Sequence, residues 1–170
     1  MKNEIQIVEQ DLKNTLEIKA NIPMWKMPVM ISKAYKKIVE HLEKSNIEPS
    51  DPPYIHYLNI NWDEVKEEGR FLSFIKMFNR KWEMLIGFPV KENREGSGEI
   101  SAGILPKGKY VQSMHYGPYQ KVGETYKEMI SWIKQNNLDI MNESVEIYLN
   151  DPRNTKKKDL QTIVLIPIAE

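Results

Sequence analysis

The chain has 170 residues, of which 41% are apolar, and its 24 basic and 24 acidic side chains cancel to a formal net charge of zero. Such a chain has no field of one sign to attract nucleic acid or an anionic membrane, so we expect neither as a direct partner. Cysteine is absent, which excludes disulfides and thiolate metal sites. The N-terminus is too polar for a signal peptide, and the longest apolar run, 163–169, is far short of the roughly 20 residues of a membrane helix. A cytoplasmic protein is expected.

The first half of the chain predicts strands around one helix. Segment 5–22 mixes alternating and β-branched residues and predicts one or two strands. Residues 30–42 predict a helix, because their apolar side chains recur at helical steps and Pro28 lies near the start, where a missing N–H is tolerated. After a proline-rich loop, 54–60 and 83–90 predict two further strands.

The second half follows the same order. Glycines at 96 and 98 predict a flexible connector, and 109–116 predicts a strand. Gly117-Pro118 then turns the chain into a second helix, whose apolar face contains Val122, Tyr126, Met129, Ile130 and Ile133. Residues 144–150 and 162–168 predict the last two strands.

Matching residues indicate that the second half repeats the first. Tyr35-Lys36 matches Tyr126-Lys127, and Tyr57-Leu58-Asn59 matches Tyr148-Leu149-Asn150, in each case 91 positions later. Asn46 and Asn137 keep the same spacing. The sequence therefore predicts a single α+β domain of two tandem β-α-β-β modules, 1–95 and 100–170, with a cleft at their junction, where ligand sites are favoured.

The first module contains extra sequence between its last two strands. Phe71, Phe74, Ile75 and Phe78 follow the i, i+3, i+4, i+7 pattern of an amphipathic helix, expected at about 63–79. Such a helix would either dock on the surface of the sheet or form a lid over the cleft.

Alternation along 144–150 singles out Glu146. Val145, Ile147 and Leu149 form one aliphatic face, expected under the helices, while Glu146 and Tyr148 point to the other. A carboxylate in a cleft is costly unless it is paired or protonated, and a cationic ligand would supply the partner. The alternative is a strand glutamate hydrogen-bonded to a neighbouring donor, with no ligand.

The repeat places other residues around Glu146. A shift of 91 puts Ile55 at the position of Glu146 and Tyr57 at that of Tyr148. Trp62 follows the first of these strands and Trp82 opens the next, so both are expected to border the cleft.

Three stretches resemble the GyrI-like, or AraC-type effector-binding, family. They are 146–168, with its Glu-x-Tyr and Asn-Asp-Pro motifs and terminal Ile-Pro; 114–138, with the Gly-x-Tyr helix start; and 86–90. The resemblance implies an antiparallel sheet with two helices on one face and a central ligand cleft. In drug-sensing members, the motif glutamate meets lipophilic cations amid aromatic side chains, and Glu146 occupies that position. Tyr116 and Phe74 complete our set of candidate ligand-binding residues.

The first hypothesis is therefore a stand-alone protein that binds a flat, lipophilic, aromatic cation for xenobiotic sequestration or sensing. One alternative is a hydrolase of reactive xenobiotics, with Glu146 or a tyrosine as acid–base group. Another is a module that binds a protein partner such as gyrase. Strand-like sequence begins by Ile5, so no DNA-binding helix-turn-helix is expected before it. His41, His56 and His115 lack metal-ligand spacing, and neither metal nor cofactor is expected.

Overall fold

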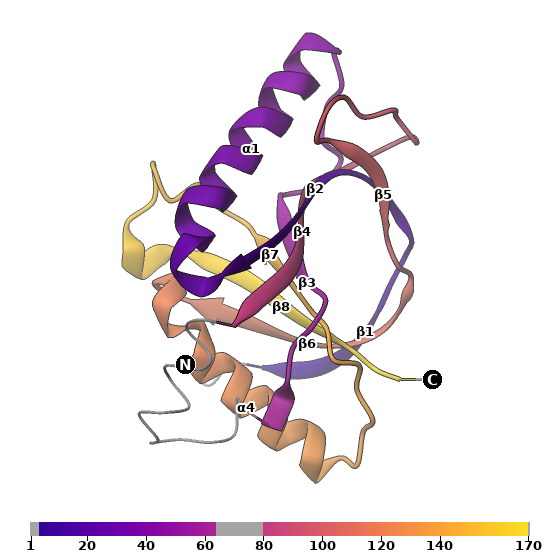
Figure 1. Cartoon of the computed structure of the whole chain (residues 1–170). Helices are drawn as coiled ribbons and strands as arrows, with labels where there is room; N and C mark the ends of the chain where they lie inside the picture. Colours follow the sequence, from indigo (N-terminus) through magenta and orange to yellow (C-terminus); the bar gives the residue numbers. More distant parts are fainter. Residues whose placement is uncertain (1–3, 64–79, 170) are drawn as a thin grey trace.

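The computed structural model describes residues 4–63 and 80–169, which form one eight-stranded antiparallel sheet in the order β1-β6-β8-β7-β3-β4-β2-β5 (Figure 1). The strands are β1 (Ile5–Gln10), β2 (Lys13–Pro23), β3 (Tyr54–Tyr57), β4 (Lys81–Val90), β5 (Ser101–Leu105), β6 (Gly108–Tyr116), β7 (Ser144–Tyr148) and β8 (Gln161–Pro167). The helices are α1 (Met27–Lys44) and α4 (Val122–Gln135), with 3-10 turns η1 (Met24–Lys26), η2 (Tyr119–Lys121) and η3 (Lys157–Asp159). The predicted α+β fold is confirmed. No helix in the described part of the chain is both long and apolar enough to cross a membrane.

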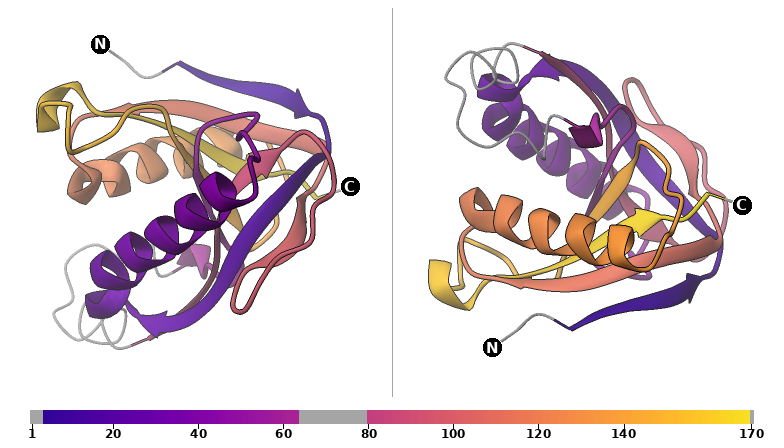
Figure 2. Two further views of the ribbon diagram at one scale, coloured as in Figure 1. Left: turned by 90° about the horizontal axis from the view of Figure 1, so that it is seen from above. Right: turned by 90° about the horizontal axis from the view of Figure 1, so that it is seen from below.

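The two main helices each bury one stripe of side chains against the sheet. Ala34, Ile38 and Leu42 of α1 recur one helical turn apart and pack against β2 and β4. Met129 and Ile133 do the same for α4 over the strands of the second half. Figure 2 shows both helices on one side of the molecule and the corner formed by β1, β2 and β5 on the other.

The two halves repeat each other in detailed contacts. Asn46 and Asn137 both have left-handed backbone, with φ of 49° and 51°, and both end a helix. Each donates its backbone N–H three residues back, to Glu43 and Lys134 respectively. Isolated bridges join Pro49 to Val90 and Ile140 to Ile168, equivalent pairs in the two halves. At the centre β3 pairs with β7, and Ile55 stands opposite Glu146. The pseudo-twofold axis therefore passes between these two residues.

The asparagines of the repeated Tyr-Leu-Asn motif have the same structural role. The Asn59 side chain donates to the carbonyl of Lys81 and accepts from the N–H of Glu83. Asn150 does the same with Asp159 and Gln161. Each asparagine thus hydrogen-bonds the backbone at the end of the connection that follows its strand. The predicted helix at about 63–79 falls in the first connection and, apart from residue 63, lies outside the described residues.

The predicted flexible connector at 96–98 is a packed turn that leads into β5, a strand that the sequence analysis missed. A Cβ on Gly96 would lie 1.9 Å from the carbonyl oxygen of Ile100, and Gly98 has a φ of +62°. The N–H of Ile100 closes the turn on the carbonyl of Ser97 at 3.1 Å. The short, small-residue segment Ser101–Leu105 lacks clear alternation, so its pairing with β2 had no periodic signal.

The expected orientation of β7 is wrong. Val145 packs with Leu105, Tyr110 and Leu165 on the face away from the helices, and Ile147 packs against the same cluster. Glu146 instead points toward α4. Leu105 of the edge strand β5 and Tyr110 of β6, the strand next to the other edge, pack here on the central strands, because the sheet curls (Figure 1). Both faces are therefore apolar and buried, and alternation alone could not tell which of them carries the helices.

The left-handed asparagines give a test of the repeat. We expect Asn46→Ala and Asn137→Ala each to lower the free energy of unfolding by about 1–2 kcal/mol, because a Cβ without a local polar group disfavours positive φ. Urea unfolding followed by circular dichroism measures this. Ser45→Ala, at the neighbouring exposed position with a φ of −96°, is the control and should change stability by less than about 0.5 kcal/mol. Equal effects at Ser45 and Asn46 would contradict the backbone explanation.

Candidate functional site

Glu146 is a buried carboxylate at the centre of the sheet. It lies on β7 beside the pseudo-twofold axis and is 6% exposed. One oxygen accepts a hydrogen bond from the Tyr126 hydroxyl of α4 at 2.9 Å, and the other accepts from the Tyr148 hydroxyl at 2.7 Å. Two neutral hydroxyls thus solvate the charge without neutralising it, and a cation would be a stronger partner for this carboxylate than either hydroxyl.

Tyrosines gather around this carboxylate from both halves. Tyr57 and Tyr148 are related by the repeat, as are Tyr35 and Tyr126. The Tyr119 ring stands edge-on to Tyr148, with centroids 5.3 Å apart. Burial raises the pKa of each of these side chains, and charge on Glu146 raises it further: Tyr35, Tyr57, Tyr119, Tyr126 and Tyr148.

Burial dominates the electrostatics of this group. It raises the pKa of Glu146, while the hydrogen bonds from Tyr148 and Tyr126 and the nearby His115 imidazole act to lower it. Burial also makes the largest contribution to the raised pKa of Tyr126 and Tyr148. The tyrosines therefore remain neutral donors, and the carboxyl is the group whose charge a ligand can control.

The two predicted tryptophans flank the tyrosines. Trp62 donates its indole N–H to the carbonyl of Met141 at 2.7 Å and packs against Tyr126, with ring centroids 6.0 Å apart. Trp82 stands edge-on to Tyr57 at 6.1 Å, and the Arg80 guanidinium lies over its ring at 5.3 Å. Each tryptophan thus contacts a tyrosine of the group around Glu146.

Of the three remaining predicted ligand-binding residues, the structure describes two, and these differ in their distance from Glu146. Ile55 is buried directly across from Glu146. Tyr116 is 53% exposed at the end of β6, and alternation from the buried His115 points it away from the helices and from Glu146. Phe74 lies outside the described residues.

Tyr35, Tyr119 and Tyr126 are not among the site residues that the sequence predicts. Tyr35 and Tyr126 were interpreted as apolar helix-face positions. Tyr35 and Tyr126 occupy matching positions in the two halves, and this match could have identified them. Two residues related by a pseudo-twofold axis lie at equal distances from it, so if one lies near the axis the other does too.

A second buried carboxylate, Glu17, lies on the opposite face of the sheet and is 7% exposed. One of its oxygens accepts from the Tyr54 hydroxyl at 2.5 Å and from the Thr15 hydroxyl at 2.9 Å. Its side chain fills the space that a Cβ on Gly103 would occupy, at 2.2 Å from the carboxyl carbon. Glu17 is therefore a second buried carboxylate with hydroxyl donors, and it is packed directly against the backbone of β5.

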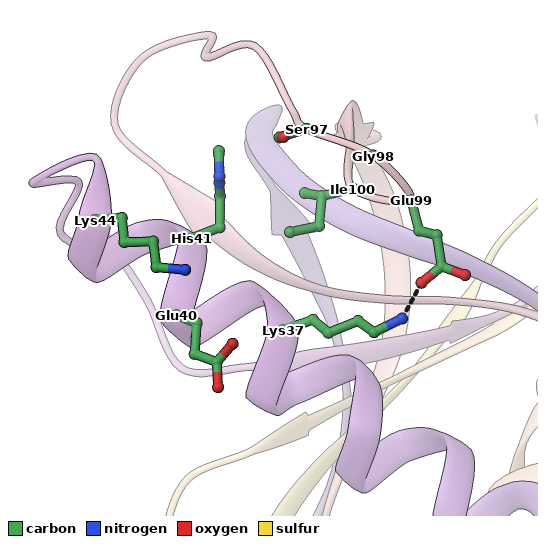
Figure 3. Close-up of a pocket in the computed structure, with 8 residues that line it drawn as sticks. All are labelled: Lys37, Glu40, His41, Lys44, Ser97, Gly98, Glu99 and Ile100. Atoms are coloured by element: carbon green, nitrogen blue, oxygen red, sulfur yellow. Dashed lines mark hydrogen bonds and ion pairs between the residues drawn. The ribbon is translucent and has the colours of Figure 1, made fainter.

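An open depression of about 390 Å³ lies apart from Glu146, between α1 and the turn before β5 (Figure 3). Four of its eight lining residues are charged, and Lys37 and Glu99 form an ion pair across it. Aromatic walls are absent from the lining residues: Lys37, Glu40, His41, Lys44, Ser97, Gly98, Glu99 and Ile100. Within the described ranges, no group of three or more His, Cys, Asp or Glu side chains could hold a metal ion. The site with a buried charge and aromatic surroundings is the one at Glu146.

The raised pKa of Glu146 predicts how stability depends on pH. Folding favours the protonated carboxyl, so its stabilising contribution is present below the ordinary pKa of 4.5 and is lost as the pH rises through the raised value. Without ligand, Glu146→Gln should therefore melt at a higher temperature than the wild type at pH 8, by roughly 2–4 °C for each 1 kcal/mol gained. The difference should shrink toward pH 4.5. A variant less stable than the wild type at pH 8 would contradict this.

Comparison with known proteins found a matching family model and several solved structures with a similar fold. The sequence matches the model of the GyrI-like small molecule binding domain family over residues 68–169. No curated protein matches the chain in sequence. The C-terminal domain of EcmrR superposes with a TM-score of 0.73 at 16% identity, covering 100% of this chain and 99% of that domain. In the EcmrR–DNA complex, with a TM-score of 0.75 at 16% identity, the match covers 99% of this chain but 58% of the EcmrR chain.

Two further structures share the fold. SAV2435 bound to tetraphenylphosphonium gives a TM-score of 0.62 at 12% identity, covering 98% of this chain and 94% of SAV2435. A hydrolase from Listeria innocua gives 0.63 at 15% identity, covering 98% of this chain and 92% of the hydrolase. At these identities the likeness is one of fold.

Proposed function

Because this chain belongs to the GyrI-like small molecule binding domain family, we propose that it binds a flat, lipophilic cation at Glu146, for xenobiotic sequestration or sensing. The observation that carries the proposal is a carboxylate that is 6% exposed and solvated by two tyrosine hydroxyls. A buried carboxylate of this kind is destabilising for the protein alone and becomes favourable when a cation pairs with it.

The aromatic surroundings support a lipophilic ligand. Tyr57, Tyr148, Trp62 and Trp82 offer apolar area and negative ring faces, and each good cation–π contact contributes about 0.5–2 kcal/mol. SAV2435, which shares the fold, is bound to tetraphenylphosphonium, which is a lipophilic, aromatic cation, although it is tetrahedral and not flat. Its delocalised charge and phenyl groups match a site that combines one carboxylate with rings.

Titration with rhodamine 6G or tetraphenylphosphonium, followed by tryptophan quenching, tests the proposal. Trp62 and Trp82 contact the tyrosine group and should report binding, whereas Trp25 is exposed on η1 and adds background. A Trp25→Phe variant removes that background. Neutral triphenylphosphine oxide, which retains three phenyl groups, is the matched control. Micromolar binding of the cations and at least tenfold weaker binding of the neutral compound are expected, and equal affinities would contradict the proposal.

A hydrolase is the second candidate. A neighbour in fold from Listeria innocua is a hydrolase, and a carboxyl with a raised pKa beside tyrosine hydroxyls has the properties of a general acid. Mass spectrometry of candidate reactive xenobiotics after incubation with the protein separates the two functions. Recovery of unchanged compound supports binding alone, and a product that Glu146→Gln fails to form supports hydrolysis.

A further inference from the structure

A second buried ionisable group, His115, lies on the same face of the sheet as Glu146. His115 is 4% exposed on β6, and β8 alone separates β6 from β7. Thr162 of β8 stands opposite His115 on one side and Tyr148 on the other. Directly opposed residues share a face, so these three side chains form a row across three strands. The row ends at Tyr148, which donates its hydroxyl to Glu146.

The hydrogen bonds of His115 fit both of its protonation states. Nε2 lies 3.2 Å from the carbonyl oxygen of Pro118, which can only accept, so Nε2 carries a proton. Nδ1 lies 2.9 Å from the hydroxyl of Thr125, which can donate or accept. The neutral ring accepts at Nδ1 and the imidazolium donates there, so the ring can gain or lose a proton without moving.

The same contacts link the imidazole to the aromatic group. Pro118, held by His115, directly precedes Tyr119, whose ring stands edge-on to Tyr148. Two strand spacings separate the backbones of His115 and Tyr148, and Glu146 lies two residues further along β7, so the backbones of His115 and Glu146 are about 12 Å apart. Thr162 and Val164 on the intervening strand β8 are buried, so salt screens the charges of His115 and Glu146 far less than it would at the surface.

Other titratable groups around the pair do not compete for the proton. On α4, Glu124 and Glu128 near Thr125 are exposed, as is Lys121 of η2. The groups that face the pair are tyrosines with raised pKa values: Tyr35 of α1, Tyr57 of β3, Tyr119 of η2, Tyr126 of α4 and Tyr148 of β7. Besides these tyrosines, His115 and Glu146 are the two buried ionisable side chains in the described part of this site.

We propose that His115 and Glu146 together hold a proton when no ligand is bound, and that a cation binding at Glu146 releases that proton to solvent. The inference rests on the proposed function and adds its regulation. Without ligand, the buried carboxylate is neutralised by its own proton or by the His115 imidazolium. A bound cation takes over this role, the proton passes to the buffer, and the ring becomes neutral. Protons and cations then compete, so cation affinity rises with pH, by at most about tenfold per pH unit for one proton.

Isothermal titration calorimetry with tetraphenylphosphonium tests this, because that cation has no ionisable proton. Titrations at pH 6 and pH 8, in buffers with different heats of ionisation, give the number of protons released. We expect the wild type to release a fraction of one proton per ligand and to bind more tightly at pH 8. His115→Gln retains a donor for Pro118 and a partner for Thr125 but cannot titrate, so it should release fewer protons and show a flatter pH profile.

His56 provides the matched control. It is 5% exposed, lies on β3 and bonds Glu143 at 2.8 Å on the face away from Glu146, so His56→Gln should leave proton release unchanged. Equal wild-type affinity at both pH values, or unchanged proton release in His115→Gln, would overturn the inference. Absence of binding at both pH values would instead contradict the proposed function.

An NMR measurement covers the case in which His115→Gln fails to fold. The ring Cε1–H resonances of the wild type are titrated with pH, with and without tetraphenylphosphonium. The midpoint for His115 should fall when the cation binds, while that of His56 stays the same. An unchanged His115 midpoint in the liganded protein would overturn the inference.

Discussion

Glu146→Gln is expected to weaken the binding of rhodamine 6G by about tenfold or more, equivalent to roughly 1.4 kcal/mol. The amide keeps the size of the carboxyl and can still hydrogen-bond Tyr126 and Tyr148, but it has no charge to pair with the dye. Tryptophan quenching measures the change. The same variant is expected to be more stable than the wild type at pH 8. Weaker binding together with higher stability would show that Glu146 destabilises the fold and is retained for ligand binding.

The matched control for this variant is Glu17→Gln. Both glutamates are buried and both accept from a tyrosine hydroxyl, but Glu17 lies on the face away from the helices. Glu17→Gln should leave dye affinity within about twofold of the wild type. Similar losses in the two variants would mean that the dye responds to general destabilisation, and Glu146 would then lose its role.

Gly96→Ala is expected to lower the free energy of unfolding by about 2–4 kcal/mol. The added Cβ would lie 1.9 Å from the carbonyl oxygen of Ile100 and 2.9 Å from the Cα of Ser101, and only a shift of the backbone can relieve both contacts. That shift would open the turn and withdraw Ile100 from the core beneath α1. Chemical denaturation measures the loss, which corresponds to a drop in melting temperature of roughly 2–4 °C for each 1 kcal/mol.

Two other glycines provide controls for the predicted loss of stability in Gly96→Ala. A Cβ on Gly123 of α4 would meet nothing within 4 Å, so Gly123→Ala should be neutral or slightly stabilising. Gly98 has equally open surroundings but a φ of +62°, so Gly98→Ala should cost about 1–2 kcal/mol through backbone strain alone. If Gly96→Ala were as stable as Gly123→Ala, the segment would be the flexible connector that its composition predicts.

The sequence predicted the fold where periodicity and repetition agreed. Both helices and the strands around them follow apolar spacing, and the shift between Asn46 and Asn137 recurs in the structure as matching left-handed helix ends. β5 was missed because its small residues carry no alternation. The orientation of β7 was wrong because alternation shows that Glu146 and Val145 point opposite ways, but not which face the helices cover.

The sequence likewise predicts only part of the site. Strand alternation and the repeat place Glu146, Tyr148 and Tyr57 together, and the structure brings these three into one group. Tyr126 and Tyr35 were assigned to the core faces of their helices. Helical spacing shows that such a residue faces the sheet. Which strand residue it contacts depends on how the helix packs on the strand, and a single sequence does not contain that information.

The pairing of Ile55 with Glu146 across the pseudo-twofold axis has an evolutionary consequence. If the two halves were separate, identical subunits, each residue would face its own copy at this position. Two carboxylates would then stand about 5 Å apart in a buried site, and like charges directly opposed are destabilising. Two isoleucines would carry no charge at all. Joining both halves in one gene lets the two copies diverge, which is how a nearly symmetric scaffold can hold a single negative charge beside its axis.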